Sequence, residues 1–315
     1  MQKAKRTKEI IYEDSAFKPE QLIAESAEYY GQGQLPKLVL KDDKYGMYLY
    51  QGDSLILIEQ IQKKYPDGIF DLIFADPPYF LSNGGITCQA GKMVSVNKGE
   101  WDKLPSVDQM HEFNRAWLAA CQKVLKPNGT IFVSGTSHVI HSIGFAMQQL
   151  EFKILNDITW VKPNPPPNLS CRYFTHASET ILWAAKNKKS KHKFNYAVMR
   201  EFADRKQMKS VWYDIKWDDP EQQILFEIYP PGKEEKKFGK HPTQKPEKLL
   251  ERLILSASDK DDRVFDPFYG AGTTAVAAKK LGRKFIGCEL DSQYISIALK
   301  KLSADAGQKQ LNLSL

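Results

Sequence analysis

Long apolar runs are missing from this chain of 315 residues, and so are paired cysteines. No stretch reaches the roughly 20 apolar residues that a membrane-spanning helix needs. The first ten residues, MQKAKRTKEI, are basic and polar, unlike a secretory signal, so we interpret residues 1–40 as an N-terminal arm. The four cysteines form no C-x-x-C pair, which argues against a disulfide framework or a zinc site. This pattern is typical of a protein of the reducing cytoplasm.

Two further classes are disfavoured by what the sequence does not contain. There is no G-x-x-x-x-G-K-[ST] sequence, which argues against ATP hydrolysis at a P-loop. We interpret His138 and His141 as ordinary helix or surface residues and expect no metal. Acidic residues are outnumbered, giving a net charge of +7 and a pI near 8.9. This excess favours a polyanionic partner such as nucleic acid, although a merely basic soluble enzyme would have the same composition.

Short apolar strands alternate with amphipathic helices along most of the chain. Strands are expected at 46–52, 70–76, 130–135, 153–161, 263–268 and 283–290, and helices at 53–65, 106–125, 140–150, 246–258, 273–282 and 292–302. Such alternation predicts an α/β fold with an open, mostly parallel, doubly wound sheet covered by helices on both faces.

Residues 186–240 interrupt this alternation. The stretch contains the cationic run KNKKSKHK and segments rich in turn formers, so we interpret it as an inserted lobe. Its lysines are candidates for phosphate contacts, and a solvated surface is the alternative. The predicted organisation is then an arm (1–40), a first half (41–185), the lobe (186–240), a second half (241–305) and a tail (306–315). Residues 82–101 lack periodicity, which suggests a mobile loop over a pocket.

The stretch VFDPFYGAGTTAVAAKKLG has the pattern of a strand, a glycine loop and a helix. Gly270 and Gly272 permit a sharp turn and close approach of the backbone to a ligand. Glu289 ends the next expected strand, where a carboxylate can accept hydrogen bonds from ribose hydroxyls. Asp266 and the helix start at Thr273 suit a zwitterionic ligand, unless they serve only as cap and turn support. The unit therefore predicts a site for a cofactor that contains adenosine.

The stretch DLIFADPPYF ends an expected strand with Asp76, Pro77, Pro78 and Tyr79. Because ligands bind at the carboxyl ends of strands in doubly wound sheets, we expect this turn to lie near the glycine loop. The Asp76 carboxylate and the Pro77 carbonyl are acceptors, and Tyr79 is a flat ring. This set suits an exocyclic amino group on a planar base, such as adenine N6, which must leave a duplex to enter a pocket. A turn that only terminates a strand is the alternative.

Together these residues resemble the amino-methylating DNA methyltransferases that use S-adenosylmethionine. In that family D-P-P-Y marks adenine-N6 enzymes, and DPFYGAGTT fits its phrase D-P-F-x-G-[SA]-G-T-T. The motif order, with D-P-P-Y before the glycine loop, resembles the permuted β group. The resemblance implies a Rossmann-like methyltransferase sheet with permuted motifs and an inserted target-recognition lobe.

The resemblance also assigns roles to residues. It implies catalytic roles for Asp76, Pro77, Pro78 and Tyr79, with Tyr79, and in part Phe80, stacking on the flipped adenine. Asp53 would approach the cofactor adenine, and Thr243, Gln244, Lys245 and Pro246 its methionine end. The implied cofactor-binding residues are completed by Asp76, Asp266, Pro267, Phe268, Gly270, Gly272, Thr273, Thr274 and Glu289.

Within the group, FADPPYFLSNGG and NPPPNLSCRYFTH most resemble the second adenine methyltransferase of GATC-type restriction systems, which accepts single-stranded as well as duplex DNA. The resemblance implies a site-specific enzyme of a restriction-modification system, with GATC as the candidate target and DNA as the partner. Family members are often homodimers, which leaves the oligomeric state open. Arg172, Tyr173 and Phe174 are either base contacts or core residues.

Other functions remain as alternatives at this point. RNA adenine methylation and cytosine-N4 methylation can share the acceptor motif, although no RRM, KH or zinc-finger signature is present. A nucleic-acid-binding module with a degenerate pocket is a second alternative. A dinucleotide oxidoreductase is a third, and it would leave D-P-P-Y without a role.

Overall fold

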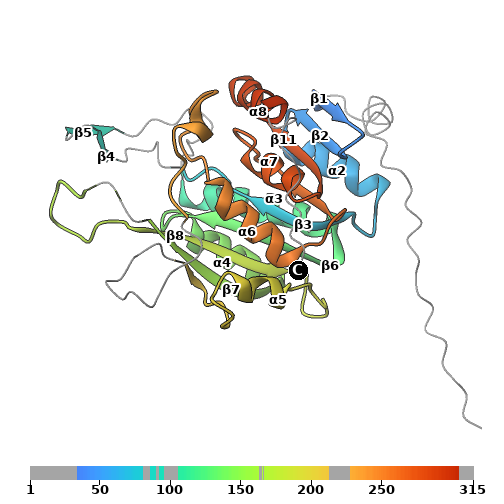
Figure 1. Ribbon diagram of the computed structural model, residues 1–315, viewed down its shortest axis with the longest axis horizontal. Helices are drawn as coiled ribbons and strands as arrows, with labels where there is room; N and C mark the ends of the chain where they lie inside the picture. The colour runs from blue at the N-terminus through green and yellow to red at the C-terminus, as the bar shows by residue number, and fades with distance from the viewer. Residues whose placement is uncertain are drawn as a thin grey trace, which may run out of the picture.

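A nine-stranded mixed sheet organises the described part of the chain (Figure 1). This computed structural model describes residues 34–80, 106–162, 165, 167–212 and 228–304, and the backbone alone at 86–89 and 92–95. The strand order is β1-β2-β11-β10-β3-β6-β8-β7-β9. The strands are β1 (Lys37–Asp42), β2 (Met47–Gln51), β3 (Phe70–Ala75), β6 (Leu125–Gly135), β7 (Lys153–Val161), β8 (Ser178–Ala185), β9 (Val211–Trp212), β10 (Arg263–Asp266) and β11 (Lys284–Glu289).

The five strands β2, β11, β10, β3 and β6 run parallel to one another. β1 and β8 pair antiparallel with the outer members of this group, and β7 pairs antiparallel with β8. The C-terminal strands β10 and β11 are inserted between β2 and β3. As a result, the carboxyl ends of β3, β10 and β11 share one edge of the sheet, as the sequence predicted.

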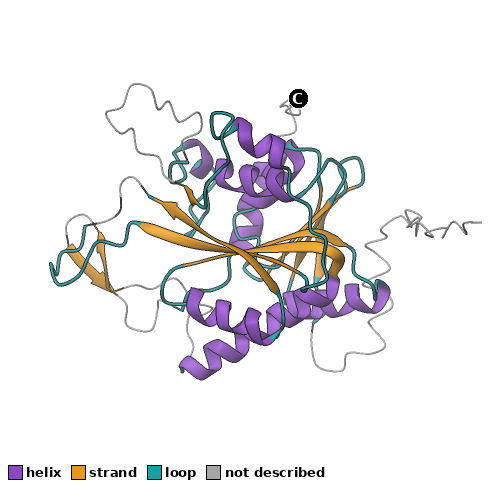
Figure 2. Cartoon of the chain, turned by 90° about the horizontal axis from the view of Figure 1, so that it is seen from below, coloured by secondary structure: helices purple, strands orange, loops and turns teal. Residues whose placement is uncertain are grey.

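Helices cover both faces of the sheet (Figure 2). One face carries α2 (Ser54–Lys64), α3 (Val107–Val124) and α4 (Ile140–Gln149), and the other carries α5 (Tyr196–Glu201), α6 (Glu247–Ala257), α7 (Thr273–Lys280) and α8 (Ser292–Ala304). Residues at the helix starts explain where two of these helices begin. At α3 the Ser106 Oγ accepts the backbone N–H of Gln109 at 3.2 Å, and Pro246 directly precedes α6. Two apolar cores, one on each face, confirm the doubly wound α/β prediction.

Several elements differ from the sequence-based expectation. β1, β8, β9 and α5 were not predicted, and β6 begins at Leu125, so the turn-like stretch KPNG belongs to a strand. β1 starts before residue 40, inside the expected arm. The expected lobe is joined to the sheet, because β9 pairs with β7 and the side chains of Met199, Trp212 and Ile228 are buried in the core.

Other predicted segments lie wholly or partly outside the described residues. These include residues 1–33 of the arm, the tail 306–315, and most of the expected loop 82–101. Within that loop the backbone forms an antiparallel pair, β4 (Ile86–Gln89) with β5 (Lys92–Ser95), which was not predicted. No helix in the described ranges has the length and apolar character to cross a bilayer.

Candidate active site at the carboxyl edge of the sheet

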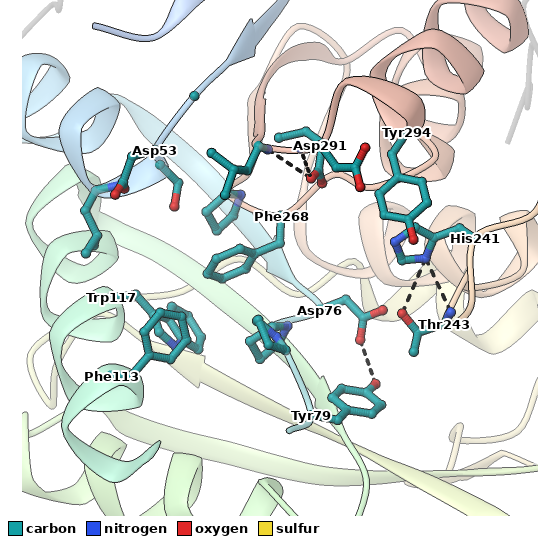
Figure 3. Close-up of a pocket in the computed structure, with 18 of the residues that line it drawn as sticks. Asp53, Asp76, Tyr79, Phe113, Trp117, His241, Thr243, Phe268, Asp291 and Tyr294 are labelled. Carbon is teal, nitrogen blue, oxygen red and sulfur yellow. Dashed lines mark hydrogen bonds between the residues drawn. The ribbon is translucent and has the colours of Figure 1, made fainter. Parts of the chain in front are cut away.

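A cavity of about 780 Å³ lies at the shared carboxyl edge of the parallel strands. It is lined by the segments that follow β2, β3, β10 and β11, by α3, and by the stretch that begins at His241. Figure 3 shows Asp76 and Phe268 between the α3 side chains Phe113 and Trp117 and the pair His241 and Tyr294. Motifs almost 200 residues apart in sequence therefore meet at one cavity, as expected.

Asp76 is held by three donors where β3 ends. Its Oδ1 accepts hydrogen bonds from the hydroxyls of Tyr79 and Ser134, both at 2.6 Å. Its Oδ2 accepts a hydrogen bond from Lys245 Nζ at 2.7 Å. Because each carboxylate oxygen has two lone pairs, these bonds fill Oδ1 and leave one acceptor position on Oδ2. The carboxylate is thus fixed in orientation and still able to accept one more donor.

Lys245 is a buried cation between two carboxylates. Its side chain is 4% exposed, and its Nζ lies 3.4 Å from Glu179 Oε2 and donates to Tyr79 Oη at 2.9 Å and to the Thr243 carbonyl at 3.1 Å. Burial acts to lower the pKa of Lys245, but Asp76 and Glu179 together hold this pKa above its usual range. The ammonium is therefore charged at neutral pH. Glu179 also forms an ion pair with Lys162, so four charged groups form one chain.

Tyr79 is placed differently from the expected stacking plate. It lines the cavity, but only 3% of its surface is exposed and its hydroxyl is bonded to Asp76. Burial, with the neighbouring Asp76, raises the pKa of this phenol well above its usual range, so it stays a donor. Phe80 also lines the cavity and packs edge-on against Phe113 at 5.7 Å between ring centroids. Stacking of either ring on a base stays a prediction.

Two expected cofactor carboxylates line the cavity, and each also supports the backbone. Asp53 caps α2 by accepting the Leu55 N–H at 2.7 Å. Glu289 Oε2 accepts the Gly270 N–H at 2.9 Å, and its Oε1 accepts the N–H groups of Leu290 and Asp291, also at 2.9 Å. Burial raises the pKa of Glu289 above its usual range. The carboxylate of Glu289 therefore joins the glycine loop to the end of β11.

The glycine loop needs its glycines for backbone reasons. Gly270 has φ of +48° and Gly272 has φ of +77°, conformations that disfavour side chains. A Cβ on Gly270 would lie 3.0 Å from His241 Nε2, and one on Gly272 would lie 2.6 Å from the Cβ of Ala298 in α8. Pro267 and Phe268 of the same loop line the cavity, and their contact with the cofactor stays a prediction.

Asp266 serves the loop itself. Its carboxylate accepts the Thr274 hydroxyl at 2.6 Å and the Phe268 N–H at 3.0 Å, and the residue is 2% exposed. Burial raises the pKa of Asp266 to about 7. These contacts correspond to the cap-and-turn alternative, and neither Asp266 nor Thr274 lines the cavity. Thr273 lines a different and smaller cavity beside α8.

In the stretch from Thr243 to Pro246, two residues contact the cavity or its network and two do not. Thr243 lines the cavity, and Lys245 reaches it through Asp76. The Gln244 amide instead donates to the Glu235 carbonyl at 3.1 Å, and Pro246 precedes the first turn of α6. Neither of these two lines the cavity, because the turn before the helix directs them elsewhere.

Several cavity and network residues were missed from sequence. They include Phe113, Trp117, Ser134, Glu179, His241, Leu290, Asp291, Gln293 and Tyr294. His241 and Leu290 to Tyr294 directly adjoin the motifs, so proximity in sequence was an available signal. Ser134 and Glu179 had none, because they meet Asp76 and Lys245 only through the pairing of β3, β6 and β8.

Two groups of possible DNA contacts lie at opposite edges. The lysine run after β8 lies near the start of β6, where the Lys191 N–H donates to Asn128 Oδ1, at the edge away from the cavity. Lys193 of this run is paired with Asp259 and Asp262. The connection between β7 and β8 instead emerges at the cavity edge. In it Tyr173 is 61% exposed and Phe174 96%, so the core alternative for these rings is wrong.

Comparison with known proteins now identifies the family. Residues 70–300 match the family described as DNA methylase. The chain belongs to the DNA methylase family. Type II methyltransferase M2.LlaDCHI of Lactococcus lactis subsp. cremoris is 53% identical over 265 residues, which cover 84% of this methylase and 92% of that protein. Type II methyltransferase M2.DpnII of Streptococcus pneumoniae is 51% identical over 273 residues, covering 83% and 96%.

Solved structures resemble this methylase in fold. The crystal structure of the M1.HpyAVI–SAM complex is 26% identical, with a TM-score of 0.56, and the match covers 81% of this chain and 98% of that one. The cytosine-N4-specific PvuII DNA methyltransferase is 20% identical, with a TM-score of 0.60 and coverage of 84% and 89%. The methyltransferase fold expected from the permuted motifs is confirmed.

Proposed function

We propose that this methylase transfers a methyl group from S-adenosylmethionine to N6 of an adenine flipped out of DNA. The observation that carries this proposal is the state of Asp76. Its carboxylate is fixed by Ser134, Tyr79 and Lys245 and keeps one acceptor position on Oδ2 at the wall of the cavity. An acceptor held in this way suits an exocyclic amino group, which has N–H donors and an electron pair that must be made available.

The cavity fits the cofactor in size and in chemistry. Its volume of about 780 Å³ is within the range of small-molecule sites, about 300–1,000 Å³. Asp53 and Glu289 bring carboxylates to it, which suit ribose hydroxyls, and Phe268 brings an apolar ring that suits an adenine. When bound, S-adenosylmethionine supplies an electrophilic methyl group on a positively charged sulfur.

The residues around Asp76 perform the activation of the amine. Asp76 Oδ2 accepts one N6–H, and the Pro77 carbonyl accepts the other, which draws the nitrogen toward tetrahedral geometry. The Asp76 carboxylate then stabilises the positive charge that grows on N6, and it passes the released proton to water. Ser134 and Tyr79 keep Oδ1 occupied, so the amine meets the Oδ2 side of the carboxylate.

The proposed DNA surface lies at the same edge as the cavity. We assign base contacts to Tyr173 and Phe174, because aromatic rings this exposed are available to stack on unpaired bases. Lys233, Lys237 and Lys240 precede the cavity residue His241 and are exposed, which makes them the proposed phosphate contacts. Resemblance to the GATC-type relatives extends the proposal to a GATC target within a restriction-modification system, to single-stranded as well as duplex DNA, and to a homodimer.

One experiment tests the proposed function directly. The chain is expressed in a host free of DNA methylation, and plasmid nucleosides are analysed by mass spectrometry with sequence mapping. N6-methyladenine at GATC is the expected product. N4-methylcytosine, or methylation confined to RNA, would refute the proposal. Purified protein is then compared on matched single- and double-stranded oligonucleotides, and analytical ultracentrifugation gives the oligomeric state.

A further inference from the structure

Glu179 lies outside the sequence motifs of the site, and of the two carboxylates in contact with Lys245 it is the more buried. It is on β8, 8% exposed, and its register partner on β7 is Trp160. Its Oε2 lies 3.4 Å from Lys245 Nζ, and its Oε1 is paired with Lys162. Burying a carboxylate costs free energy. A purely structural role for Glu179 would therefore require a positive charge that neutralises this carboxylate alone.

The charges around Lys245 do not divide into separate pairs. Asp76 and Glu179 both contact its ammonium, Tyr79 and the Thr243 carbonyl accept hydrogen bonds from it, and Lys162 faces Glu179 from the other side. If Glu179 were absent, Asp76 would be the only carboxylate opposite Lys245. The ammonium would then neutralise Asp76 more completely, and Asp76 would stabilise a new positive charge less well.

We propose that Glu179 is a positioning residue for methyl transfer. It shares the charge of Lys245, so that Lys245 fixes the orientation of Asp76 while the Asp76 carboxylate stays available to the amine. This inference rests on the proposed function for the role of Asp76. It adds a residue that reaches the reacting atoms only through Lys245.

The charge sharing has a consequence for pH. Burial acts to lower the pKa of Lys245, and the two carboxylates raise it, Asp76 more than Glu179. Removing Glu179 leaves the burial effect and one carboxylate, so the pKa of Lys245 falls. Removing Lys162 frees Glu179 to interact more with Lys245, so the pKa of Lys245 rises. These opposite shifts measure the charge coupling, and the kinetics of transfer distinguish a positioning role from a structural one.

The first test uses the protein without cofactor or DNA. NMR titration of the lysine side chains, with Lys245→Met to assign the signal, gives the pKa of Lys245 in the wild type, Glu179→Gln, Glu179→Asp and Lys162→Met. The expected shifts are downward for Glu179→Gln, upward for Lys162→Met, and near wild type for Glu179→Asp, which keeps the carboxylate. If Glu179→Gln fails to fold, it is combined with Lys162→Met, which removes both charges of the pair, and the pKa of Lys245 is still expected to fall.

The second test uses kinetics. Glu179→Gln is expected to lower kcat by about 10- to 100-fold, to leave the cofactor Kd within about threefold, and to move the alkaline limb of the kcat profile to lower pH. The matched control is Asp71→Asn, which breaks the Asp71–Lys126 pair at the other end of β3, and its alkaline limb should stay in place.

The possible failures are distinguishable. The inference is overturned if the pKa of Lys245 is the same with and without the Glu179 carboxylate. It is also overturned if Glu179→Gln lowers kcat and cofactor affinity equally, even if the protein methylates adenine. A protein that shows the opposite pKa shifts but methylates no adenine refutes the proposed function and leaves the charge coupling standing.

Discussion

Replacing Asp76 with alanine tests whether the part of the cavity that binds the amine works independently of the part that binds the cofactor. The change removes the proposed acceptor of the amine and leaves Ser134 and Tyr79 without their carboxylate partner. Lys245 keeps Glu179 at 3.4 Å and the Thr243 carbonyl at 3.1 Å, so its charge is still compensated. The fold should therefore survive, although with lower stability.

The size of each effect follows from these contacts. Removing one well-placed charge-stabilising group from a water-excluded site costs about 3–4 kcal/mol in the transition state, which is roughly 10²–10³ in rate. Breaking a buried ion pair costs about 3–5 kcal/mol of unfolding free energy, and the lower end applies because Lys245 retains a second carboxylate. Cofactor affinity should change by less than about threefold, because Asp53, Glu289 and Phe268 are untouched.

The assay is single-turnover transfer of labelled methyl groups to an oligonucleotide, with cofactor affinity measured by isothermal titration calorimetry. Asp76→Asn is the matched variant: its carbonyl oxygen still accepts from Ser134 and Tyr79, but its NH₂ group cannot accept from an amine. Both variants should lose transfer and keep cofactor binding. Transfer within tenfold of wild type in Asp76→Asn, or parallel loss of cofactor affinity in both, would refute the role given to Asp76.

Three other changes probe the cofactor loop. Gly270→Ala should cost about 1–2 kcal/mol of stability and weaken cofactor binding, because φ is +48° and the new Cβ meets His241; unchanged calorimetry would contradict this. Glu289→Gln loses an acceptor for a backbone N–H and should raise the cofactor Kd about tenfold, with kcat at saturating cofactor near wild type. Between its ordinary pKa near 3.9 and its folded pKa of about 7, Asp266 holds a proton that the unfolded chain has lost, so the free energy of unfolding falls as pH rises through this window. Urea unfolding of Asp266→Asn should lack this fall, and an identical pH dependence in both proteins would show that the Asp266 carboxyl is not the cause.

The sheet and its ligand edge were predictable because they depend on periodic patterns. Alternating strands and helices fix which ends of the strands share an edge, so the sequence alone predicts that Asp76 and Glu289 lie at the same edge. The helix expected at 106–125 agrees with α3 to within one residue at each end. These features are local in the chain or follow from general topology.

The partners of individual side chains were not predictable in the same way. Glu179 reaches Lys245 through the antiparallel register of β8, and that strand was itself missed. The hydrogen bond of the Tyr79 hydroxyl to Asp76 was also not predicted, because it depends on the burial of Tyr79 and a buried hydroxyl needs a partner. The lysine run suits DNA by its composition. It follows β8, so the edge of the sheet at which it lies depends on where that strand ends.

The position of β10 and β11 also affects how the chain is synthesised. These two strands are made last, yet they occupy the middle of the sheet between β2 and β3. Until the ribosome has passed residue 289, two long-separated strands have facing edges with unpaired backbone groups, which are sites of misassociation between nascent chains. The sheet therefore cannot be completed before β11 has been synthesised, and a product truncated before β10 would be prone to aggregation.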